Sequence, residues 1–310
     1  MALKLLVDPR ARGAYFADAV TVARAELEAV LPGVEATVDE RSTVTFLDVP
    51  LGAERAPALA RLSFVQAVFA ADGPTLHLID AAPDHVLPPE LVWGAKYRGK
   101  THELLTQLAL NLAIAACERE PTTLLDPMAG RGTTLLWGVR YGLEAWGLEK
   151  DGQALDHLQR HLKRQTKLHR LKHDLTRGGK AGRDGAFLDI RFPTTHGRLR
   201  LTIGDSRHAP KWLQGKRFDL VVADLPYGVQ FVGPGGTRNP VKTVAACAQG
   251  WADSLQPGGA IVLAYNRLLP AREQLAAPFV AAGLTLHATE APHRMSESIL
   301  RDVLVLTKPH

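Results

Sequence analysis

The fold of this 310-residue chain is decided by residues 122–134, Thr-Thr-Leu-Leu-Asp-Pro-Met-Ala-Gly-Arg-Gly-Thr-Thr. An apolar strand leads into a glycine-containing turn, and the turn opens a helix predicted over Leu135–Tyr141. This pattern is typical of the βα element of a nucleotide-binding sheet, but it lacks the Gly-Lys-Ser/Thr ending of a phosphate loop and the third glycine of the dinucleotide fingerprint. Asp126 at the strand end therefore favours a ligand with a positive amino group over a pyrophosphate. Gly130 and Gly132 allow the backbone to approach that ligand closely.

Two further acids follow predicted strands. Glu149 follows the strand Ala145–Leu148, where a carboxylate can accept hydrogen bonds from both hydroxyls of a ribose. The alternative for Glu149 is a solvated strand end paired with Lys150. Asp205 follows the strand Leu199–Ile203 and is suited to bind an adenine amine.

A fourth acid begins the stretch Asp224-Leu225-Pro226-Tyr227-Gly228, after the apolar strand 218–223. Asp224 and the carbonyl of Leu225 would accept hydrogen bonds from an exocyclic amine on a flat base, and Tyr227 would stack on the ring. The alternative is an ordinary Pro-Tyr-Gly turn after a strand. The other three acids favour the ligand interpretation, because carboxyl ends of parallel strands meet at one edge of a sheet.

The remaining elements complete an α/β pattern. Thr101 is expected to cap a helix that runs to about Glu120. Later elements are helices over 241–255 and 272–282 and strands over 260–265, 284–290 and 303–307, of which the last two are expected to form an antiparallel hairpin at the sheet edge. We therefore predict a Rossmann-like domain over residues 96–310.

The first 80 residues have a different pattern. Strands are predicted at 3–7, 34–38, 43–47 and 65–70, and helices at 14–31 and 54–61. The order β-α-β-β-α-β is the ferredoxin-like pattern, so we predict a small N-terminal α+β domain over residues 1–80. Residues 81–95 contain several prolines and are expected to form an extended linker.

Composition permits a polyanionic partner without requiring one. Thirty-seven Lys and Arg stand against thirty-two Asp and Glu, for a net charge of +5 and a pI near 9.3. The two cysteines, Cys117 and Cys247, suggest neither a disulfide framework nor a zinc site, and the histidines have no metal-ligand spacing. The first residues do not resemble a signal peptide, and no apolar run approaches the length of a membrane span. The expectation is a soluble, cytoplasmic protein without a metal.

The positive charge is concentrated in residues 160–183, which carry nine Lys or Arg and a single acid, Asp174. A second basic segment, with an aromatic residue, precedes the helix at 101. These segments either contact a phosphate backbone or are simply solvated faces. The candidate nucleic-acid-binding residues are Lys96, Arg98, Lys163, Arg164, Lys167 and Arg170.

From about residue 93 onward, these motifs resemble the class I S-adenosylmethionine-dependent methyltransferases that methylate amino groups. The Leu-Pro-Tyr-Gly form after Asp224 resembles the RNA guanine-N2 methyltransferases related to the THUMP-containing tRNA enzymes. The resemblance implies S-adenosylmethionine as cofactor, with an RNA substrate, either tRNA or rRNA. It assigns catalysis to Asp224, Leu225, Pro226 and Tyr227, and cofactor binding to Asp126, Met128, Gly130, Gly132, Thr133, Glu149, Lys150, Asp205 and Ser206.

The chain departs from that family in one respect. Between the N-terminal segment and Trp93 there is no room for a THUMP domain, which puts tRNA as the substrate in doubt. Two alternatives remain open. One is a DNA adenine-N6 or cytosine-N4 methyltransferase, although no DNA-recognition region is evident beyond residues 160–200. The other is a nucleic-acid-binding protein with a relic donor site, or a Rossmann protein that uses another nucleotide.

Overall fold

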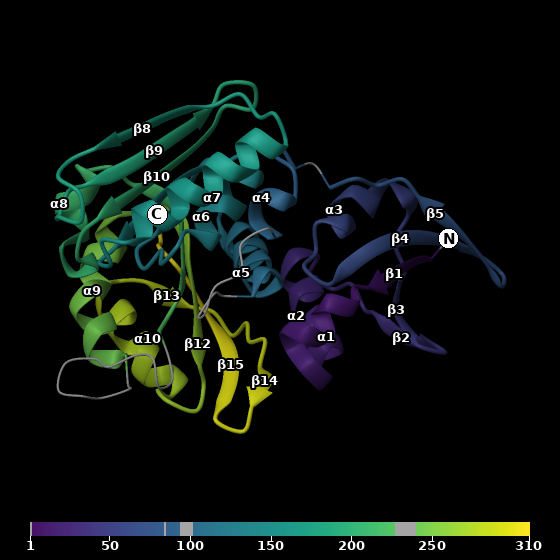
Figure 1. The fold of residues 1–310 in the computed structure, drawn as a ribbon. Coiled ribbons are helices and arrows are strands. Elements are labelled where there is room, and N and C mark those ends of the chain that lie inside the picture. The colour runs from purple at the N-terminus through teal and green to yellow at the C-terminus, as the bar shows by residue number, and fades with distance from the viewer. Residues whose placement is uncertain (1, 84, 94–101, 227–239) are drawn as a thin grey trace.

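The computed structural model describes residues 2–83, 85–93, 102–226 and 240–310. Figure 1 shows two β-sheets joined by a short connection, a small one near the N-terminus and a large one that holds most of the helices. The small sheet has five strands in the order β2-β3-β1-β4-β5, and the large one has ten strands.

The small sheet is ferredoxin-like, as predicted, with one additional strand. Strand β1 lies between β3 and β4 and pairs antiparallel with both, which is the order that the β-α-β-β-α-β pattern requires. Its elements are β1 Leu3–Val7, α1 Pro9–Tyr15, η1 Phe16–Asp18, α2 Ala19–Val30, β2 Thr37–Arg41, β3 Val44–Val49, η2 Ala53–Arg55, α3 Ala56–Ala60, β4 Val65–Asp72 and β5 Thr75–Ile79.

The predicted bounds in this region need three corrections. The single helix expected over 14–31 is divided, because Phe16 adopts a positive φ of 53° that ends α1. Strand β2 covers Thr37–Arg41 and not 34–38, because the hairpin turns later than predicted, at Ser42, whose φ is 57°. Strand β5 was not predicted; its exposed outer positions, such as Leu78, give it no clear alternation of apolar and polar residues.

The large sheet has the order β13-β15-β12-β11-β6-β7-β10-β9-β8. Strand β6 pairs parallel with both β7 and β11, so the chain leaves β6 in one direction and returns on its other side. That reversal is the switch point at which open α/β sheets bind ligands. The elements are α4 Glu90–Trp93, α5 Glu103–Ala116, β6 Thr123–Asp126, α6 Thr133–Arg140, β7 Glu144–Glu149, α7 Ala154–Leu168, β8 Asp174–Gly178, β9 Phe187–Phe192, β10 Gly197–Ile203, η3 Ser206–His208, α8 Ala209–Leu213, β11 Phe218–Asp224, α9 Val241–Asp253, β12 Leu255–Asn266, α10 Arg272–Ala281, β13 Thr285–Leu286, β14 His293–Ser296 and β15 Ile299–Thr307.

Several elements of this sheet were not predicted. The basic segment 160–183 contains the second half of helix α7 and strand β8, and β8 and β9 extend the sheet beyond β10. At the other edge β14 pairs with β15, and the strand predicted over 284–290 is reduced to the two residues of β13. Helix α5 is capped by His102, whose Nδ1 accepts the Leu104 N–H at 3.2 Å, whereas the predicted cap, Thr101, lies outside the described residues.

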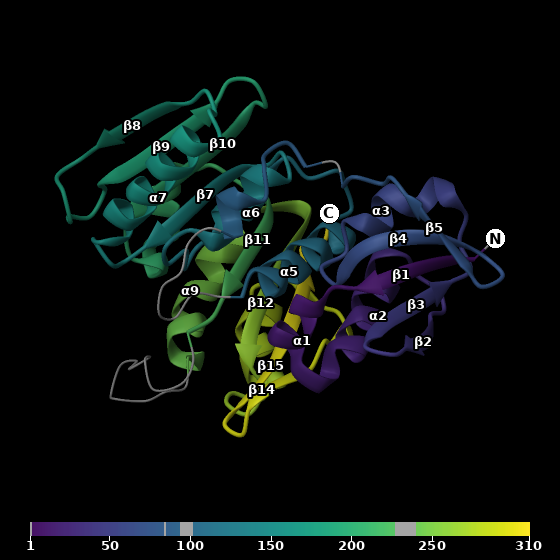
Figure 2. The same cartoon turned by 45° about the vertical axis from the view of Figure 1, so that its right-hand side comes forward.

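The N-terminal module, residues 2–79, packs directly on the large sheet. Helices α1 and α2 lie beside α5, as Figure 2 shows, and residues of both parts share one hydrophobic core. The interface also contains polar groups. The buried carboxylate of Glu26 accepts hydrogen bonds from the Ser63 N–H and hydroxyl and, at 2.6 Å, from Asn111 Nδ2 of α5. Because its buried oxygens have hydrogen-bond donors, Glu26 can link α2 of the module to α5, a helix that packs on the large sheet.

The buried Glu26 predicts a pH-dependent stability. Burial raises the pKa of Glu26 to about 7, although the hydrogen bonds from Asn111 and Ser63 lower it. The fold therefore holds a proton that the unfolded chain releases near pH 4.5, and stability is lost as the pH rises from there through 7. We expect the free energy of unfolding to fall by about 3 kcal/mol more in the wild type than in Glu26→Gln over this range. Urea unfolding at pH 5 and pH 7.5 measures this, and identical pH dependence in the two proteins would contradict it.

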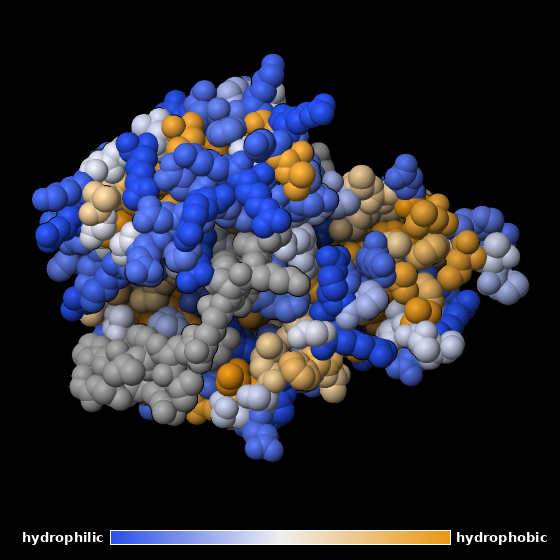
Figure 3. All heavy atoms as spheres, viewed as in Figure 1, coloured by the Kyte–Doolittle hydropathy of each residue, from blue (hydrophilic) through white to orange (hydrophobic). Residues whose placement is uncertain are grey.

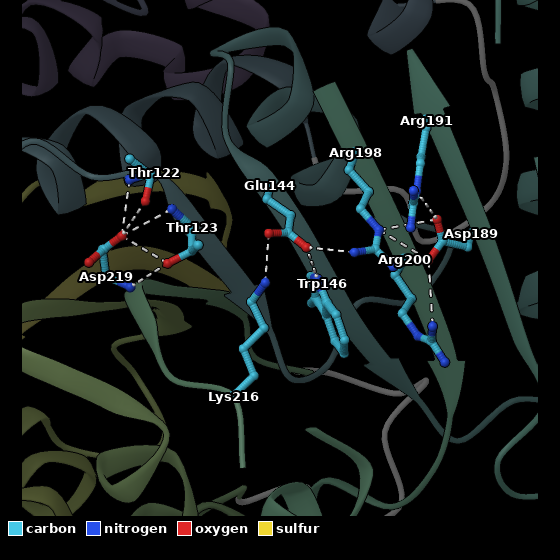
Figure 4. A network of polar contacts seen from close by, with 10 residues as sticks. All are labelled: Thr122, Thr123, Glu144, Trp146, Asp189, Arg191, Arg198, Arg200, Lys216 and Asp219. Atoms are coloured by element: carbon cyan, nitrogen blue, oxygen red, sulfur yellow. Dashed lines mark hydrogen bonds and ion pairs between the residues drawn. The ribbon is translucent and has the colours of Figure 1, made fainter. Parts of the chain in front are cut away.

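A polar network joins the amino ends of the large sheet's strands (Figure 4). At the start of β11, Asp219 Oδ2 accepts the Thr122 N–H at 3.0 Å and the Thr123 hydroxyl at 2.8 Å. Farther along, Lys216 lies 2.6 Å from Glu144, and Arg198 bridges Glu144 and Asp189. This network ties neighbouring strands together at the edge opposite the candidate site, so we assign it to stability.

The described residues contain neither a membrane-spanning helix nor a metal-binding cluster. No helix in these ranges has the length and apolar character needed to cross a membrane. Nor do the described His, Cys, Asp and Glu side chains form a group of three or more that could hold a metal ion.

Candidate active site

The candidate site lies at the carboxyl ends of the central strands. Asp126 ends β6, Glu149 ends β7 and Asp224 ends β11, and these three strands are neighbours in the sheet. Asp205 follows β10, whose last residue, Ile203, pairs with Glu149. The structure thus brings the four predicted acids to one edge of the sheet, because parallel strands place their carboxyl ends together.

The loop between β6 and α6 is shaped by two of these acids. Asp126 Oδ1 accepts the Met128 N–H at 2.9 Å, and Glu149 Oε2 accepts the Gly130 N–H at 2.8 Å. Gly130 and Gly132 have positive φ values of 53° and 87°, which side chains rarely adopt. A Cβ placed on Gly130 would meet no heavy atom within 4 Å, so this glycine borders open space. A ligand can therefore lie against the backbone at Gly130.

Asp126 is an unusual carboxyl group. It is only 2% exposed, and burial raises its pKa to about 7, although the Thr134 hydroxyl and the Met128 N–H donate to it and lower the pKa. The negative charges of Glu149 and Asp224 raise it further. A buried carboxyl group with two neighbouring negative charges favours a cationic ligand and disfavours a phosphate.

The second acid, Glu149, has a partly exposed carboxylate that is well placed to bind a ligand. Its Oε1 accepts the N–H groups of Lys150 and Asp151, both at 2.8 Å, while Oε2 holds the loop at Gly130. The carboxylate therefore has a fixed position between the loop and the start of the next segment. The predicted alternative, a side-chain pair with Lys150, is not among the contacts of Glu149, which instead accepts the Lys150 backbone N–H.

Asp205 and Ser206 form the β10 side of the site. The hydrogen bond from Arg207 lowers the pKa of Asp205 to about 2, so that Asp205 is an ionised acceptor at neutral pH. The hydroxyl of Ser206 donates to the carbonyl of Pro127. This contact joins the segment after β10 to the loop after β6, and both segments border the same edge of the sheet.

Solved structures of other proteins share this arrangement of strands and helices. No protein-family model and no curated protein sequence matches the chain. The crystal structure of TrmN from Thermus thermophilus aligns over 99% of this chain and 99% of its own, with 16% identity and a TM-score of 0.51. The chain has a Rossmann-like methyltransferase fold.

Two further structures are similar at lower TM-scores. A methyltransferase from Pyrococcus furiosus aligns over 71% of this chain and 92% of its own, with 14% identity and a TM-score of 0.44. The T. thermophilus 16S rRNA N2 G1207 methyltransferase RsmC, solved with AdoMet and guanosine, aligns over 92% of this chain and 60% of its own, with 19% identity and a TM-score of 0.40.

Within this methyltransferase fold, the stretch after β11 lies at the switch point. Leu225 is buried and its N–H donates to the Ala264 carbonyl at 2.8 Å, which holds the chain beside β12 as it leaves the sheet. Pro226 is the last described residue of the stretch. The predicted stacking residue, Tyr227, lies outside the described residues, and so do Lys96 and Arg98.

A residue that the sequence analysis missed contacts Asp224. Arg301 of β15 donates from Nη2 to Asp224 Oδ1 and forms an ion pair with it, although its own side chain is only 1% exposed. The available signal was the pair Arg301-Asp302 within the apolar run Ile299–Thr307, because a charged residue in a buried strand needs a partner. The predicted strand began at 303 and left this pair out.

The remaining predicted residues lie around the site. Met128 and Gly130 are partly buried, Gly132 and Thr133 are buried at the start of α6, and Lys150 is exposed.

The predicted nucleic-acid-binding residues of the described segment are all exposed on or just after α7, and the surface over α7 is predominantly hydrophilic in Figure 3. They are Lys163, Arg164, Lys167 and Arg170.

Proposed function

We propose that the protein transfers a methyl group from S-adenosylmethionine to an exocyclic amine of a nucleic-acid base, guanine N2 in RNA. The observation that supports this most is the meeting of Asp126, Glu149 and Asp224 at the strand tips, where the charges of Glu149 and Asp224 act on the buried carboxyl group of Asp126. S-adenosylmethionine carries a sulfonium and an ammonium group, which such a cluster attracts. A dinucleotide or nucleoside triphosphate brings phosphates, which it repels.

The residues present fit this donor. Glu149 is fixed beside Gly130 and would accept hydrogen bonds from the two ribose hydroxyls. Asp205, ionised at neutral pH, would accept from the adenine amine, and the open space at Gly130 would admit the methionine part near Asp126. Met128, Gly132, Thr133, Lys150 and Ser206 would line the same loop and strand ends.

The acceptor amine would be held at Asp224. An exocyclic amine is a poor nucleophile because its lone pair is delocalised into the ring. By accepting its N–H groups, Asp224 and the Leu225 carbonyl would direct the lone pair toward the methyl carbon. When bound, the donor would supply that carbon activated on a positive sulfur. The N–C bond would form as the S–C bond broke, and the amine would release one proton. Tyr227 would stack on the base.

An RNA substrate is favoured by Leu225, which stands where DNA amino-methyltransferases more often have a second proline. The exposed cations of α7 would contact the phosphate backbone. We also propose that the protein binds RNA, takes part in tRNA processing and is located in the cytoplasm. Transfer of radiolabelled methyl to tRNA, rRNA and DNA in one assay tests it. Labelling of DNA alone would favour the adenine-N6 or cytosine-N4 alternative, and the absence of labelling in all three would contradict methyl transfer to nucleic acid.

The raised pKa of Asp126 predicts how donor affinity changes with pH. A cationic donor stabilises the ionised carboxylate, so below a pKa of about 7 binding must displace a proton. We expect affinity for S-adenosylmethionine to fall by up to about tenfold per pH unit below 7 and to level off above it. Calorimetry between pH 5.5 and 8.5 measures this. Asp126→Asn should bind more weakly and lose the pH dependence, and a wild-type affinity that is equal at pH 6 and pH 8 would contradict the prediction.

A further inference from the structure

The contact between Arg301 and Asp224 spans three strands of the sheet. Asp224 on β11 pairs with Ala264 on β12, and Ala264 in turn pairs with Val303 on β15. Arg301 is two residues from Val303, so it is on the same face of β15 as Val303, since side chains alternate along a strand. Its side chain must therefore cross β12 to reach Asp224. The small side chain of Ala264 leaves room for that crossing.

This face of the sheet is covered by α5 and by the N-terminal module. Directly opposite Arg301 on β14 is His293, which is fully buried. The ring of Tyr15, at the end of α1, meets the ring of His293 edge-on, with centroids 5.1 Å apart. The Tyr15 hydroxyl donates to the carbonyl of Leu104 in the first turn of α5, at 2.9 Å. Tyr15 thus lies between α5 and the strand pair that carries Arg301.

A second contact fixes the same region. Asp18 of the N-terminal module accepts the backbone N–H of Arg294 at 2.8 Å, so β14 contacts the module at His293 and again at the next residue. Burial lowers the pKa of His293 to about 4, and the positive charge of Arg301 lowers it further. His293 is therefore neutral at pH 7 and adds no second cation beside Arg301.

We infer that Arg301 is a positioning residue that holds the Asp224 carboxylate at the acceptor site, and that the N-terminal module keeps Arg301 in place through Tyr15 and His293. The inference rests on the proposed function. The side chain of Asp224 is 21% exposed, whereas that of Arg301 is enclosed by the protein. Because the enclosed guanidinium cannot move with the carboxylate, the ion pair fixes the direction of the Asp224 side chain. In this role Asp224 acts on the amine as a hydrogen-bond acceptor, and the amine loses its proton only after attack.

The test is a double-mutant cycle on turnover. We would measure kcat and the KM for RNA in the wild type, Arg301→Met, Asp224→Asn and the double variant, with calorimetry of S-adenosylmethionine binding for each. Arg301→Met should lower kcat about 100-fold while KM and donor affinity change less than about threefold. In the Asp224→Asn background, the same change should lower kcat by less than about tenfold, because Asn offers Arg301 one uncharged oxygen in place of the carboxylate. Arg301→Lys should restore part of the lost kcat, since it returns the charge without the planar fork.

Two further variants separate positioning from general stability. Arg267→Met removes another arginine of this sheet edge, which pairs with Asp302 and Glu290 and not with Asp224, and should lower the melting temperature without lowering kcat. Tyr15→Leu should lower kcat in the same direction as Arg301→Met, with donor affinity kept. The inference, but not the proposed function, would be overturned if Arg301→Met kept the wild-type kcat. It would also be overturned if Arg301→Met lowered kcat equally in the wild-type and Asp224→Asn backgrounds. A wild type that binds the donor but methylates no RNA would overturn the proposed function as well.

Discussion

Asp224→Ala is expected to lower methyl transfer by on the order of 10³-fold while the affinity for S-adenosylmethionine changes little. The carboxylate ends β11 at the switch point, separate from the ribose and adenine contacts proposed for Glu149 and Asp205. Removing it takes away the acceptor that orients the amine and leaves the donor contacts in place. Single-turnover labelling of RNA measures the transfer, and calorimetry measures the donor affinity.

The control for this variant addresses folding. Asp224→Ala leaves the buried guanidinium of Arg301 without this carboxylate, and breaking a buried ion pair costs several kcal/mol. Asp224→Asn keeps the shape and one oxygen that can accept from Arg301, so it should be more stable and lose less activity, about 10- to 100-fold. Thermal scans give a temperature at which each variant is folded. Activity assays at that temperature separate the loss of catalysis from the loss of stability. Lost donor affinity with retained turnover would reverse the roles assigned to the two parts of the site.

Glu149→Ala is expected to weaken binding of S-adenosylmethionine by about 10²- to 10³-fold, because the variant lacks the charged group proposed to accept two hydrogen bonds from the ribose hydroxyls. The same change frees the Gly130 N–H, which Glu149 holds at 2.8 Å, so the loop after β6 also loses an anchor. Glu149→Gln keeps one acceptor oxygen and should lose about tenfold. Calorimetry with S-adenosylmethionine measures each dissociation constant.

A matched control comes from the opposite end of the neighbouring strand. Glu120 is an exposed acid that precedes β6, whereas Glu149 ends β7 at the edge that carries the candidate site. Glu120→Ala removes the same charge from the protein but should leave donor affinity unchanged. An equal loss of affinity in Glu120→Ala and Glu149→Ala would show that net charge, and not the ribose contact, controls binding.

Local patterns predicted the fold well where burial and turn chemistry agree. The strand Leu3–Val7, the β-α-β-β-α-β order of the N-terminal module and the helix after Gly132 are all present. Patterns failed where a strand gains its stability from neighbours. Strands β8, β9 and β14 carry charged or mixed residues and are held by pairing with β9, β10 and β15, which no local alternation reveals.

The four acids of the site could be found from the sequence because each stands at a strand end, and parallel strands place those ends together whatever the rest of the chain does. What the sequence could not show is how these acids act on one another. The rise in the pKa of Asp126 depends on its burial and on the charges of Glu149 and Asp224 beside it. Arg301, which pairs with Asp224, lies 77 positions later across an intervening strand, and its strand neighbour His293 packs against Tyr15 of the first helix. Residue type and spacing alone determined where the carboxylates stand; only the packing of three distant segments decided which charge holds Asp224, because burial and Coulomb interactions depend on distance in space and not in sequence.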